Sequence, residues 1–324
     1  MAGKTLAASV AYPTIGIILL GGISDKVNRY PLHTSAGIAY TGVETPVETR
    51  TRLFLTDDRQ IGLFNGTEIS TDPTSRSPFH PIAMYEKIIR QRHSLGSGFI
   101  SYESESVNIL SGSSDSGAAA LGIALAHLAG LDPYTPEFEN LLRKISESVG
   151  RSLYGGLSLT NVDGSKIWTE RLLGPEAFSD IVIAGFRFNA IRNPSDRIHE
   201  NIVNHPGYEN RKKETAMKGR RLKELSRSGD VRGIFDLAME DTDRYHSIIE
   251  EVGVKVQTEE MRKLISQVRE IRKKFWASYI VTGGSNVFVP VERAHLKELL
   301  AETQGLHHGY TLLKVAGPAR VVQP

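Results

Sequence analysis

The stretch ILSGSSDSGAAALGIALAHLAGL, residues 109–131, joins a short apolar run to a serine- and glycine-rich loop and then to an alanine-rich segment. The alanine-rich part predicts a helix over 115–130, with the loop 111–117 directly before it. The first turn of a helix has free N–H groups and a partial positive charge, and small residues let an anion approach that backbone closely. We therefore expect a phosphate site at this loop, with hydroxyl groups from Ser111, Ser113 and Ser114 as further donors.

The loop does not match the common phosphate-binding motifs. No Gly-Lys-Ser/Thr follows it, as a Walker loop requires, and it lacks the Gly-x-Gly-x-x-Gly pattern of dinucleotide sites. Asp115 also adds a negative charge, which a simple phosphate site would disfavour. The alternative is a capped helix that packs closely through Ala118, Ala119 and Ala120. The loop alone does not decide between these two interpretations.

Length and composition restrict the class of protein. With 324 residues, the chain is long enough for two domains of ordinary size. The 39 basic and 37 acidic residues nearly balance, which does not favour nucleic acid or a membrane surface as a partner. Cysteine is absent, which excludes disulfides, thiolate nucleophiles and cysteine-bound zinc, and which is compatible with a cytoplasmic location.

The expected strands and helices are mixed without regular alternation, which predicts an α+β fold with a boundary near 170–178. The expected strands are 15–20, 35–41, 50–55, 60–64, 98–102, 157–162, 181–188, 278–282, 287–291 and 310–315. The expected helices are 80–94, 115–130, 136–149, 195–203, 208–227, 231–251, 258–276 and 293–303.

Four groups of segments, in this order along the chain, resemble the GHMP kinase superfamily. They are AYPTIGIILLGG (11–22) with PLHTSAGIAY (31–40), the loop 111–117, SESVGRSLYGGL (146–157) and VTGGSN (281–286). Together with MEDTDRYHSI (239–248) they are similar to the mevalonate diphosphate decarboxylase branch. The resemblance implies a two-domain kinase fold, with a domain over 1–175 that carries the phosphate loop 110–118 and a second over 176–324. ATP and substrate would bind in the cleft between the domains.

Two positions depart from the decarboxylase pattern. Leu19 stands where the decarboxylases carry a lysine, and Thr282 stands where they carry an aspartate. A leucine cannot neutralise charge, and a threonine hydroxyl is not a base near neutral pH. The chain therefore keeps the kinase motifs and lacks the charged pair linked to decarboxylation.

Glu147 is a third departure, because the decarboxylases have glycine there, beside the serines that hold the substrate's 5-diphosphate. A carboxylate about 4 Å from a phosphate would repel it by ~4 kcal/mol per charge pair at an effective dielectric of 20. The same carboxylate accepting a hydrogen bond from a free hydroxyl would gain ~1.5–3 kcal/mol. This difference favours a substrate with an unphosphorylated alcohol at C5, which is mevalonate itself.

Together the three departures resemble the mevalonate 3-kinases of thermoacidophilic archaea. This resemblance implies transfer of the ATP γ-phosphate to the 3-hydroxyl of (R)-mevalonate, with Mg2+ as a second cofactor and a homodimeric protein. With no base available, catalysis would depend on positioning and charge neutralisation. The alternatives are a decarboxylase that acts on a phosphorylated mevalonate and a catalytically inactive relative that only binds ligand.

The implied substrate-binding residues are Leu19, Glu147, Arg151 and Thr282. Arg151 would bind the mevalonate carboxylate through its planar guanidinium, Glu147 would accept from the 5-hydroxyl and Leu19 would pack against the methyl side. The alternatives are a salt bridge between Glu147 and Arg151, four residues apart, and a core position for Leu19.

The implied nucleotide-binding residues lie mainly in the loop. They are Asn65, Ser111, Gly112, Ser113, Ser114, Ser116, Gly117, Arg192 and Ser195, with Ser113 also a ligand to Mg2+. Ser111, Arg192 and Thr282 would take part in catalysis. Asn65 would equally suit a hairpin turn, and Ser195 the N-cap of helix 195–203. We assign no chemistry to Asp241 and His246, which we expect on a helix surface or a cleft wall.

Overall fold

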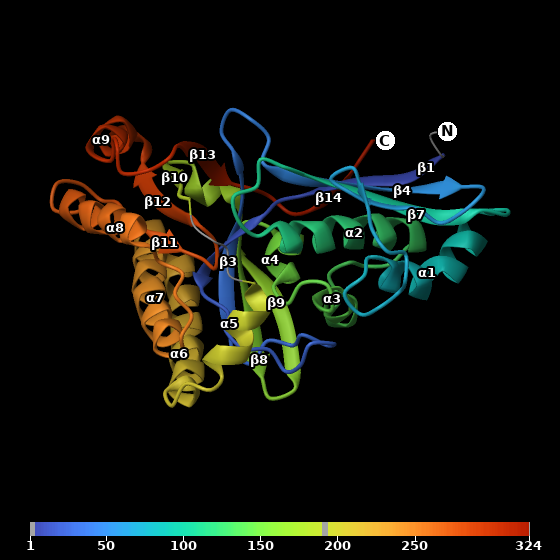
Figure 1. Cartoon of the computed structure of the whole chain (residues 1–324), viewed down its shortest axis with the longest axis horizontal. Coiled ribbons are helices and arrows are strands. Elements are labelled where there is room, and N and C mark those ends of the chain that lie inside the picture. Colours follow the sequence, from blue (N-terminus) through green and yellow to red (C-terminus); the bar gives the residue numbers. More distant parts are fainter. Residues whose placement is uncertain (1–3, 190–193, 324) are drawn as a thin grey trace.

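The computed structural model describes residues 4–189 and 194–323 and contains two β-sheets with helices packed against them (Figure 1). The longer helices gather at two places. Helices α6 to α9 lie at one end of the molecule, whereas α1 and α2 lie beneath the sheet at the other end. This arrangement confirms the predicted α+β class.

The first sheet has six strands, and the helix that follows the loop 111–117 packs against it. Its strand order is β14 (Arg320–Val322), β1 (Thr5–Ala11), β4 (Glu48–Thr56), β7 (Phe99–Val107), β5 (Gly62–Phe64) and β6 (Thr67–Glu68). Helix α2 (Ser113–Ala129) packs on β1 and β4, and α1 (Phe79–Arg92) packs on α2. Ala118, Ala119, Ala120 and Ala124 are buried, because small side chains let α2 approach the sheet closely.

The second sheet has eight strands and joins the two halves of the chain. Its order is β11 (Ile280–Val281), β12 (Asn286–Glu292), β10 (Ile181–Arg187), β13 (Tyr310–Val315), β3 (Ser35–Gly42), β8 (Leu157–Asp163) and β9 (Lys166–Leu173), with β2 (Thr14–Ile18) paired to β3. Because β13 pairs with β3 and β14 with β1, the C-terminal segment returns to the N-terminal half. The division at 175/176 stays a prediction.

The remaining helices surround these sheets. They are α3 (Pro136–Arg143), α4 (Val149–Tyr154), α5 (Ser195–Ile202), α6 (Tyr208–Ser228), α7 (Val231–Glu251), α8 (Glu259–Ile271) and α9 (Leu296–Glu302), with short 3-10 turns at Pro175–Phe178 and Arg293–His295. Helices α6 and α7 pack on β2. Across the described ranges, we find no helix with the length and apolar character needed to cross a membrane.

Several boundaries differ from the expected ones. The helix expected over 136–149 ends at Arg143, because the chain turns between Lys144 and Ser148, and a separate helix, α4, begins at Val149. Strands β1, β9 and β14 were not predicted. The sequence of β1, TLAASVA, is rich in alanine and serine, which have weak strand preference, and β14 is only three residues long. The sequence of β9, KIWTERLL, contains three charged residues among its eight.

Candidate active site

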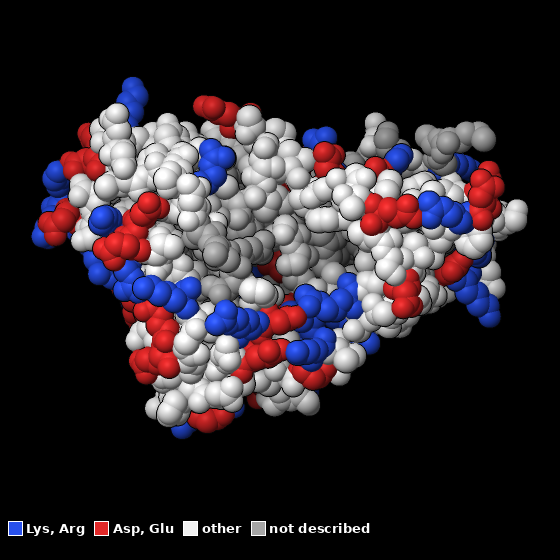
Figure 2. Space-filling model, in the orientation of Figure 1, with Lys and Arg blue, Asp and Glu red and all other residues white. Residues whose placement is uncertain are grey.

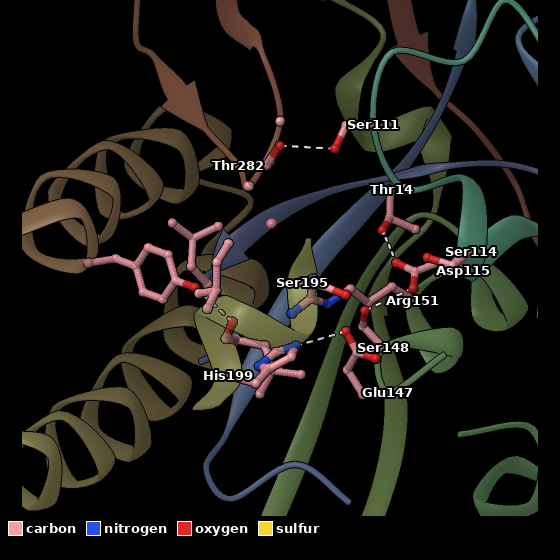
Figure 3. A pocket seen from close by; sticks show the side chains of 18 residues that line it. Thr14, Ser111, Ser114, Asp115, Glu147, Ser148, Arg151, Ser195, His199 and Thr282 are labelled. Atoms are coloured by element: carbon pink, nitrogen blue, oxygen red, sulfur yellow. Dashed lines mark hydrogen bonds and ion pairs between the residues drawn. The ribbon is translucent and has the colours of Figure 1, made fainter. Parts of the chain in front are cut away.

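A cavity lies where the two halves of the chain meet, and it contains most of the expected site residues. Figure 2 shows the surface hollowed at its centre, with charged side chains gathered along the lower rim. The lining comprises Thr14, Gly16, Leu19, Leu20, Ser111, Gly112, Ser114, Asp115, Glu147, Ser148, Arg151, Ser195, Ile198, His199, Tyr245, Thr282, Gly283 and Gly284 (Figure 3).

The loop before α2 forms one wall of this cavity. Gly112 precedes α2 with a φ of 79°, and a Cβ there would lie 2.5 Å from the backbone nitrogen of Thr14, so a larger residue would clash. Ser111 Oγ lies 2.9 Å from Thr282 Oγ1, which joins the loop to the segment after β11 (Figure 3). The first turn of α2 therefore opens on the cavity beside Thr282.

Ser116 differs from the other loop serines in its position. Its side chain is fully buried, and its hydroxyl lies 2.6 Å from the Thr49 hydroxyl and 3.1 Å from the Ser113 carbonyl oxygen. It does not line the cavity, because this part of the helix already faces β4. Gly117 lines a neighbouring apolar hollow instead.

Asp115 places a carboxylate at the phosphate loop, and three hydroxyls compensate it. Thr14 donates to one oxygen at 2.5 Å, while Ser146 and Ser148 donate to the other at 2.5 and 2.8 Å. Hydrogen bonds to an ionised acceptor are strong, and the start of a helix favours negative charge. Asp115 therefore fixes the loop against the segment before α4, which gives this carboxylate a structural role at the loop 111–117.

Arg151 is buried in the cavity wall with almost no partner. Its side chain is 6% exposed. Its Nη2 lies 3.5 Å from the Ile18 carbonyl oxygen, and its Nε has no hydrogen-bond partner among the described residues. Burial lowers the pKa of Arg151, although a guanidinium stays protonated at neutral pH. The charges of Asp115 and Glu147 act on Arg151, but within the described residues neither forms a salt bridge with it, so this buried cation is suited to an anionic ligand.

Glu147 is paired away from Arg151, so the alternative salt bridge between them is wrong. Arg29 donates to its Oε2 from Nη2 at 2.7 Å and from Nε at 3.1 Å, and His199 Nε2 lies 3.0 Å from its Oε1. Burial alone would raise the pKa of Glu147, but the hydrogen bond from His199 and the charge and hydrogen bonds of Arg29 hold it far below its usual range. Glu147 is therefore ionised near neutral pH, and it precedes α4 rather than lying on it.

The segment that carries Leu19 is held by buried groups from α6 and α7. The Leu19 N–H donates to Asp241 at 2.7 Å, and Arg211 Nη2 donates to the Leu19 carbonyl oxygen at 2.9 Å. Tyr245 donates to the Leu20 carbonyl oxygen at 3.2 Å. The side chain of Leu19 reaches the cavity while its backbone is fixed at both ends.

Asp241 and His246 are fully buried, so the expectation of a helix surface or cleft wall is wrong. His246 Nε2 lies 2.9 Å from the Val281 carbonyl oxygen, directly before Thr282. Asp241 and Tyr245 are four residues apart, which places them on one side of a helix, and both contact the segment of Leu19 and Leu20. That spacing was available in the sequence, and it would have indicated a face of α7 turned toward the site.

The proposed nucleotide residues lie around the start of α2. An apolar hollow beside Ser113 and Ser114 is lined by Phe64, Ile69, Pro78, Tyr102, Gly117, Ala118, Leu121 and Ile145. Asn65 lies in the β5–β6 turn at a φ of 49°, and its Oδ1 accepts from the Ser106 N–H at 2.8 Å. Asn65 also lines a second hollow with Ser111 and Ser113.

Two expected residues at the start of α5 have different outcomes. Ser195 lines the cavity, but Pro194 occupies the N-cap position, so the alternative role of Ser195 as a helix cap is wrong. Arg192 lies outside the described residues. Within residues 4–189 and 194–323, no cluster of three His, Cys, Asp or Glu side chains is placed to hold a metal ion.

Comparison with known proteins identifies the family of this chain. Residues 11–167 match the diphosphomevalonate decarboxylase-like N-terminal domain, and residues 193–297 match the mevalonate-3-kinase C-terminal domain. The mevalonate-3-kinase of Picrophilus torridus is 47% identical over 313 residues, which cover 96% of each chain. The chain belongs to the mevalonate-3-kinase family.

Solved structures place this family within the expected fold. The mevalonate-3-kinase of Thermoplasma acidophilum, with mevalonate 3-phosphate and ADP bound, is 44% identical, with all of both chains covered and a TM-score of 0.91. The mevalonate diphosphate decarboxylase of Staphylococcus aureus is 18% identical, with 99% of this chain and 98% of that chain covered and a TM-score of 0.81. The latter likeness shows the shared fold alone. The predictions of the family and of the two-domain GHMP kinase fold are confirmed.

Proposed function

We propose that the protein transfers the γ-phosphate of ATP to the 3-hydroxyl of (R)-mevalonate and forms 3-phosphomevalonate. The observation that carries this proposal is Arg151, a buried guanidinium in the cavity whose Nε has no hydrogen-bond partner and which forms no salt bridge within the described residues. The mevalonate carboxylate supplies a counter-ion, and the planar guanidinium binds both of its oxygens.

Binding of the carboxylate by Arg151 determines where the other groups of the substrate lie in this proposal. With its carboxylate at Arg151, mevalonate places its 5-hydroxyl toward Glu147, whose ionised carboxylate accepts a hydrogen bond from an alcohol and repels a phosphate ester. Leu19 supplies an apolar contact for the methyl side. The 3-hydroxyl then faces the Ser111–Thr282 pair and the start of α2.

The phosphate chain of ATP lies along the loop 110–118 in this proposal. The free N–H groups of α2 and the hydroxyls of Ser113 and Ser114 bind its oxygens, with contributions from Ser195 and Arg192. The adenine occupies the apolar hollow that includes Phe64 and Tyr102, with Asn65 at its edge. Ser113 would hold Mg2+ as its protein ligand, and the ion would supply charge neutralisation at the transferred phosphoryl group.

The reaction would depend on positioning rather than on a strong base. The ionisable side chains that line the cavity are Asp115, Glu147, Arg151, His199 and Tyr245. Asp115 is held by three hydroxyls and Glu147 by Arg29 and His199, so neither is free to remove the 3-hydroxyl proton. In-line placement and neutralisation of charge supply the rate enhancement, because phosphoryl transfer through a loose transition state needs little early deprotonation.

The experiment that tests this function identifies the phosphorylated carbon. The purified protein is incubated with ATP, Mg2+ and mevalonate, and the product is examined by 31P and 13C NMR together with a measurement of released carbon dioxide. Phosphorus coupling at C3 without carbon dioxide supports the proposal. Phosphorylation at C5, or carbon dioxide released from a 5-phosphorylated substrate, would contradict it and favour the decarboxylase.

Two further proposals rest on the family resemblance alone, namely that the protein is a homodimer and that it is cytoplasmic. Light scattering during size-exclusion chromatography measures the mass directly. A mass near 35.7 kDa, that of one chain, would contradict the dimer.

A further inference from the structure

Arg29 lies next to the substrate cavity without lining it. Glu147 and His199 both line the cavity, whereas Arg29 contacts the Glu147 carboxylate and is itself only 1% exposed. It comes from the loop after β2 and also donates from Nη1 to Asp196 on α5 at 2.9 Å. The buried guanidinium of Arg29 therefore links Glu147, in the N-terminal half of the chain, to Asp196, in the C-terminal half.

Arg29 and His199 both direct hydrogen-bond donors at the carboxylate of Glu147. Arg29 uses Nε and Nη2 on Oε2, and His199 uses Nε2 on Oε1. His199 Nδ1 accepts from the Gly22 N–H at 3.0 Å, so the ring proton lies on Nε2 and is directed at Glu147. If the carboxylate were absent, these same donors would surround the place that it had occupied.

We propose that Arg29 is a specificity-determining residue that acts through Glu147. With Glu147 present the pair is neutral, and this end of the cavity accepts an alcohol. Without Glu147 the cation of Arg29 faces the vacated space, and the same end accepts an anion. The phosphate of a substrate phosphorylated at C5 then occupies the place of the protein carboxylate and takes hydrogen bonds from Arg29 and His199.

Asp196 does not cancel this effect. Its second oxygen accepts from Arg76 at 2.6 Å, so Asp196 is shared between two arginines. Its side chain is partly exposed at 29%, and water screens it further. The charge of Arg29 is therefore balanced mainly by the buried Glu147.

The inference rests on the proposed function, and its test is a cycle of binding measurements. Calorimetry compares mevalonate with mevalonate 5-phosphate on the wild type, Glu147→Ala, Arg29→Met and the double variant. We expect Glu147→Ala to shift the preference toward the 5-phosphate by about 100-fold, and the double variant to lose that shift. Arg76→Met is the matched control, because Arg76 contacts Asp196 but not Glu147, and it should leave the preference unchanged.

These variants distinguish an effect of the Arg29 charge from an effect of the larger cavity. If the single and double variants gain the same preference for the 5-phosphate, enlargement of the cavity explains the gain and the role of Arg29 is wrong. If Glu147→Ala gains nothing, the role is also wrong. Glu147→Gln, which keeps the volume of the side chain, serves where Glu147→Ala fails to fold. It should weaken the rejection of the 5-phosphate only while Arg29 is present.

Chemical rescue supplies an independent readout. Formate added to Glu147→Ala should restore turnover of mevalonate by refilling the carboxylate position, and it should not do so in the double variant. Equal rescue in both variants would contradict the role of Arg29. Failure of the proposed function can be distinguished from failure of the Arg29 role. In the former case the wild type would not phosphorylate mevalonate at C3, whatever the variants bind.

Discussion

Two buried arginines in this molecule have opposite surroundings. Arg211, on α6, is fully buried and contacts both oxygens of Asp241, with Lys218 adding a second cation to that carboxylate at 3.0 Å. Arg151, on α4, has one hydrogen bond of 3.5 Å to a carbonyl oxygen. Burial alone would lower the pKa of Arg211, but Asp241 raises it, whereas burial lowers the pKa of Arg151.

This difference separates a structural ion pair from a ligand site. The charge of Arg211 is balanced by its ion pair with Asp241, and the two residues hold the backbone of Leu19 in place, although Arg211 Nε also has no hydrogen-bond partner among the described residues. Under the proposed function, the Arg151 guanidinium gains its ionic partner only when substrate binds, and the fold has already borne the cost of removing this charge from water. Removing Arg211 should therefore affect mainly stability, and removing Arg151 mainly activity.

The largest expected effect is on stability, from Arg211→Met. This change leaves Asp241 buried without its main partner and should lower the free energy of unfolding by about 3–5 kcal/mol. Urea denaturation measures the change. Arg220→Met on the same helix is the control, since Arg220 is exposed and should cost less than about 0.5 kcal/mol. Equal effects of the two variants would contradict a structural role for the Arg211 pair.

Arg151→Met should reverse this pattern. Loss of an unpaired buried charge should leave stability unchanged or raise it, whereas kcat/KM for mevalonate should fall by about 100- to 1,000-fold because a desolvated charge pair with the substrate is lost. Steady-state kinetics and urea denaturation measure both properties on the same samples. Arg151→Lys should recover part of the activity, since it keeps the charge but not the planar fork. A strong loss of stability in Arg151→Met would show that we have misjudged its surroundings.

Acid should weaken the framework around Arg211 through His33. The Gly21 N–H donates to His33 Nε2 at 3.1 Å, and burial, together with the charge of Arg211, lowers the pKa of His33 to about 4. The unfolded chain takes up this proton near pH 6.5, before the folded chain does. Stability is therefore fully present above about pH 6.5 and falls by about 3 kcal/mol as the pH drops toward 4. Unfolding of His33→Gln, followed over the same range, should show a flatter pH dependence. An unchanged slope would contradict this assignment.

The smallest expected effect is at the pair between Ser111 and Thr282. Thr282→Val keeps the shape and removes one hydrogen bond, worth about 1 kcal/mol, so kcat should fall by about 2- to 10-fold with little change in the KM for mevalonate. Ser285→Ala lies in the same turn but does not line the cavity, and should leave kcat unchanged. Complete loss of turnover in Thr282→Val would show that the hydroxyl is more than a positioning group.

The sequence predicted the cavity better than it predicted the partners within it. Leu19, Ser111, Glu147, Arg151 and Thr282 come together as expected, because ordered motifs with a resemblance to a known family carry their spatial arrangement with them. The sequence did not show that Arg151 is without a salt bridge in the described structure. Its spacing of four residues from Glu147 along a helix suggested that these two residues pair with each other. The chain turns at Glu147 instead, and that residue pairs with Arg29, which lies 118 positions earlier.

Long-range contacts also explain the residues that were placed incorrectly. Asp241 and His246 bind backbone atoms of segments far away in the chain, and no local pattern indicates such contacts. Ser116 fits a phosphate motif by type, but the hydroxyl of Thr49 on β4 determines where it points. Strands β1 and β14 form at the edge of the first sheet through pairing between the two ends of the described chain.

The central claim is that Arg151 forms no salt bridge within the described residues because the substrate carboxylate is its ionic partner. Calorimetric binding of mevalonate and of 3-methylpentane-1,3,5-triol, which replaces the carboxylate with an alcohol, tests it on the wild type and on Arg151→Met. We predict that the wild type prefers mevalonate by about 100-fold and that Arg151→Met binds the two compounds almost equally. A preference for mevalonate that persists in Arg151→Met would contradict the account.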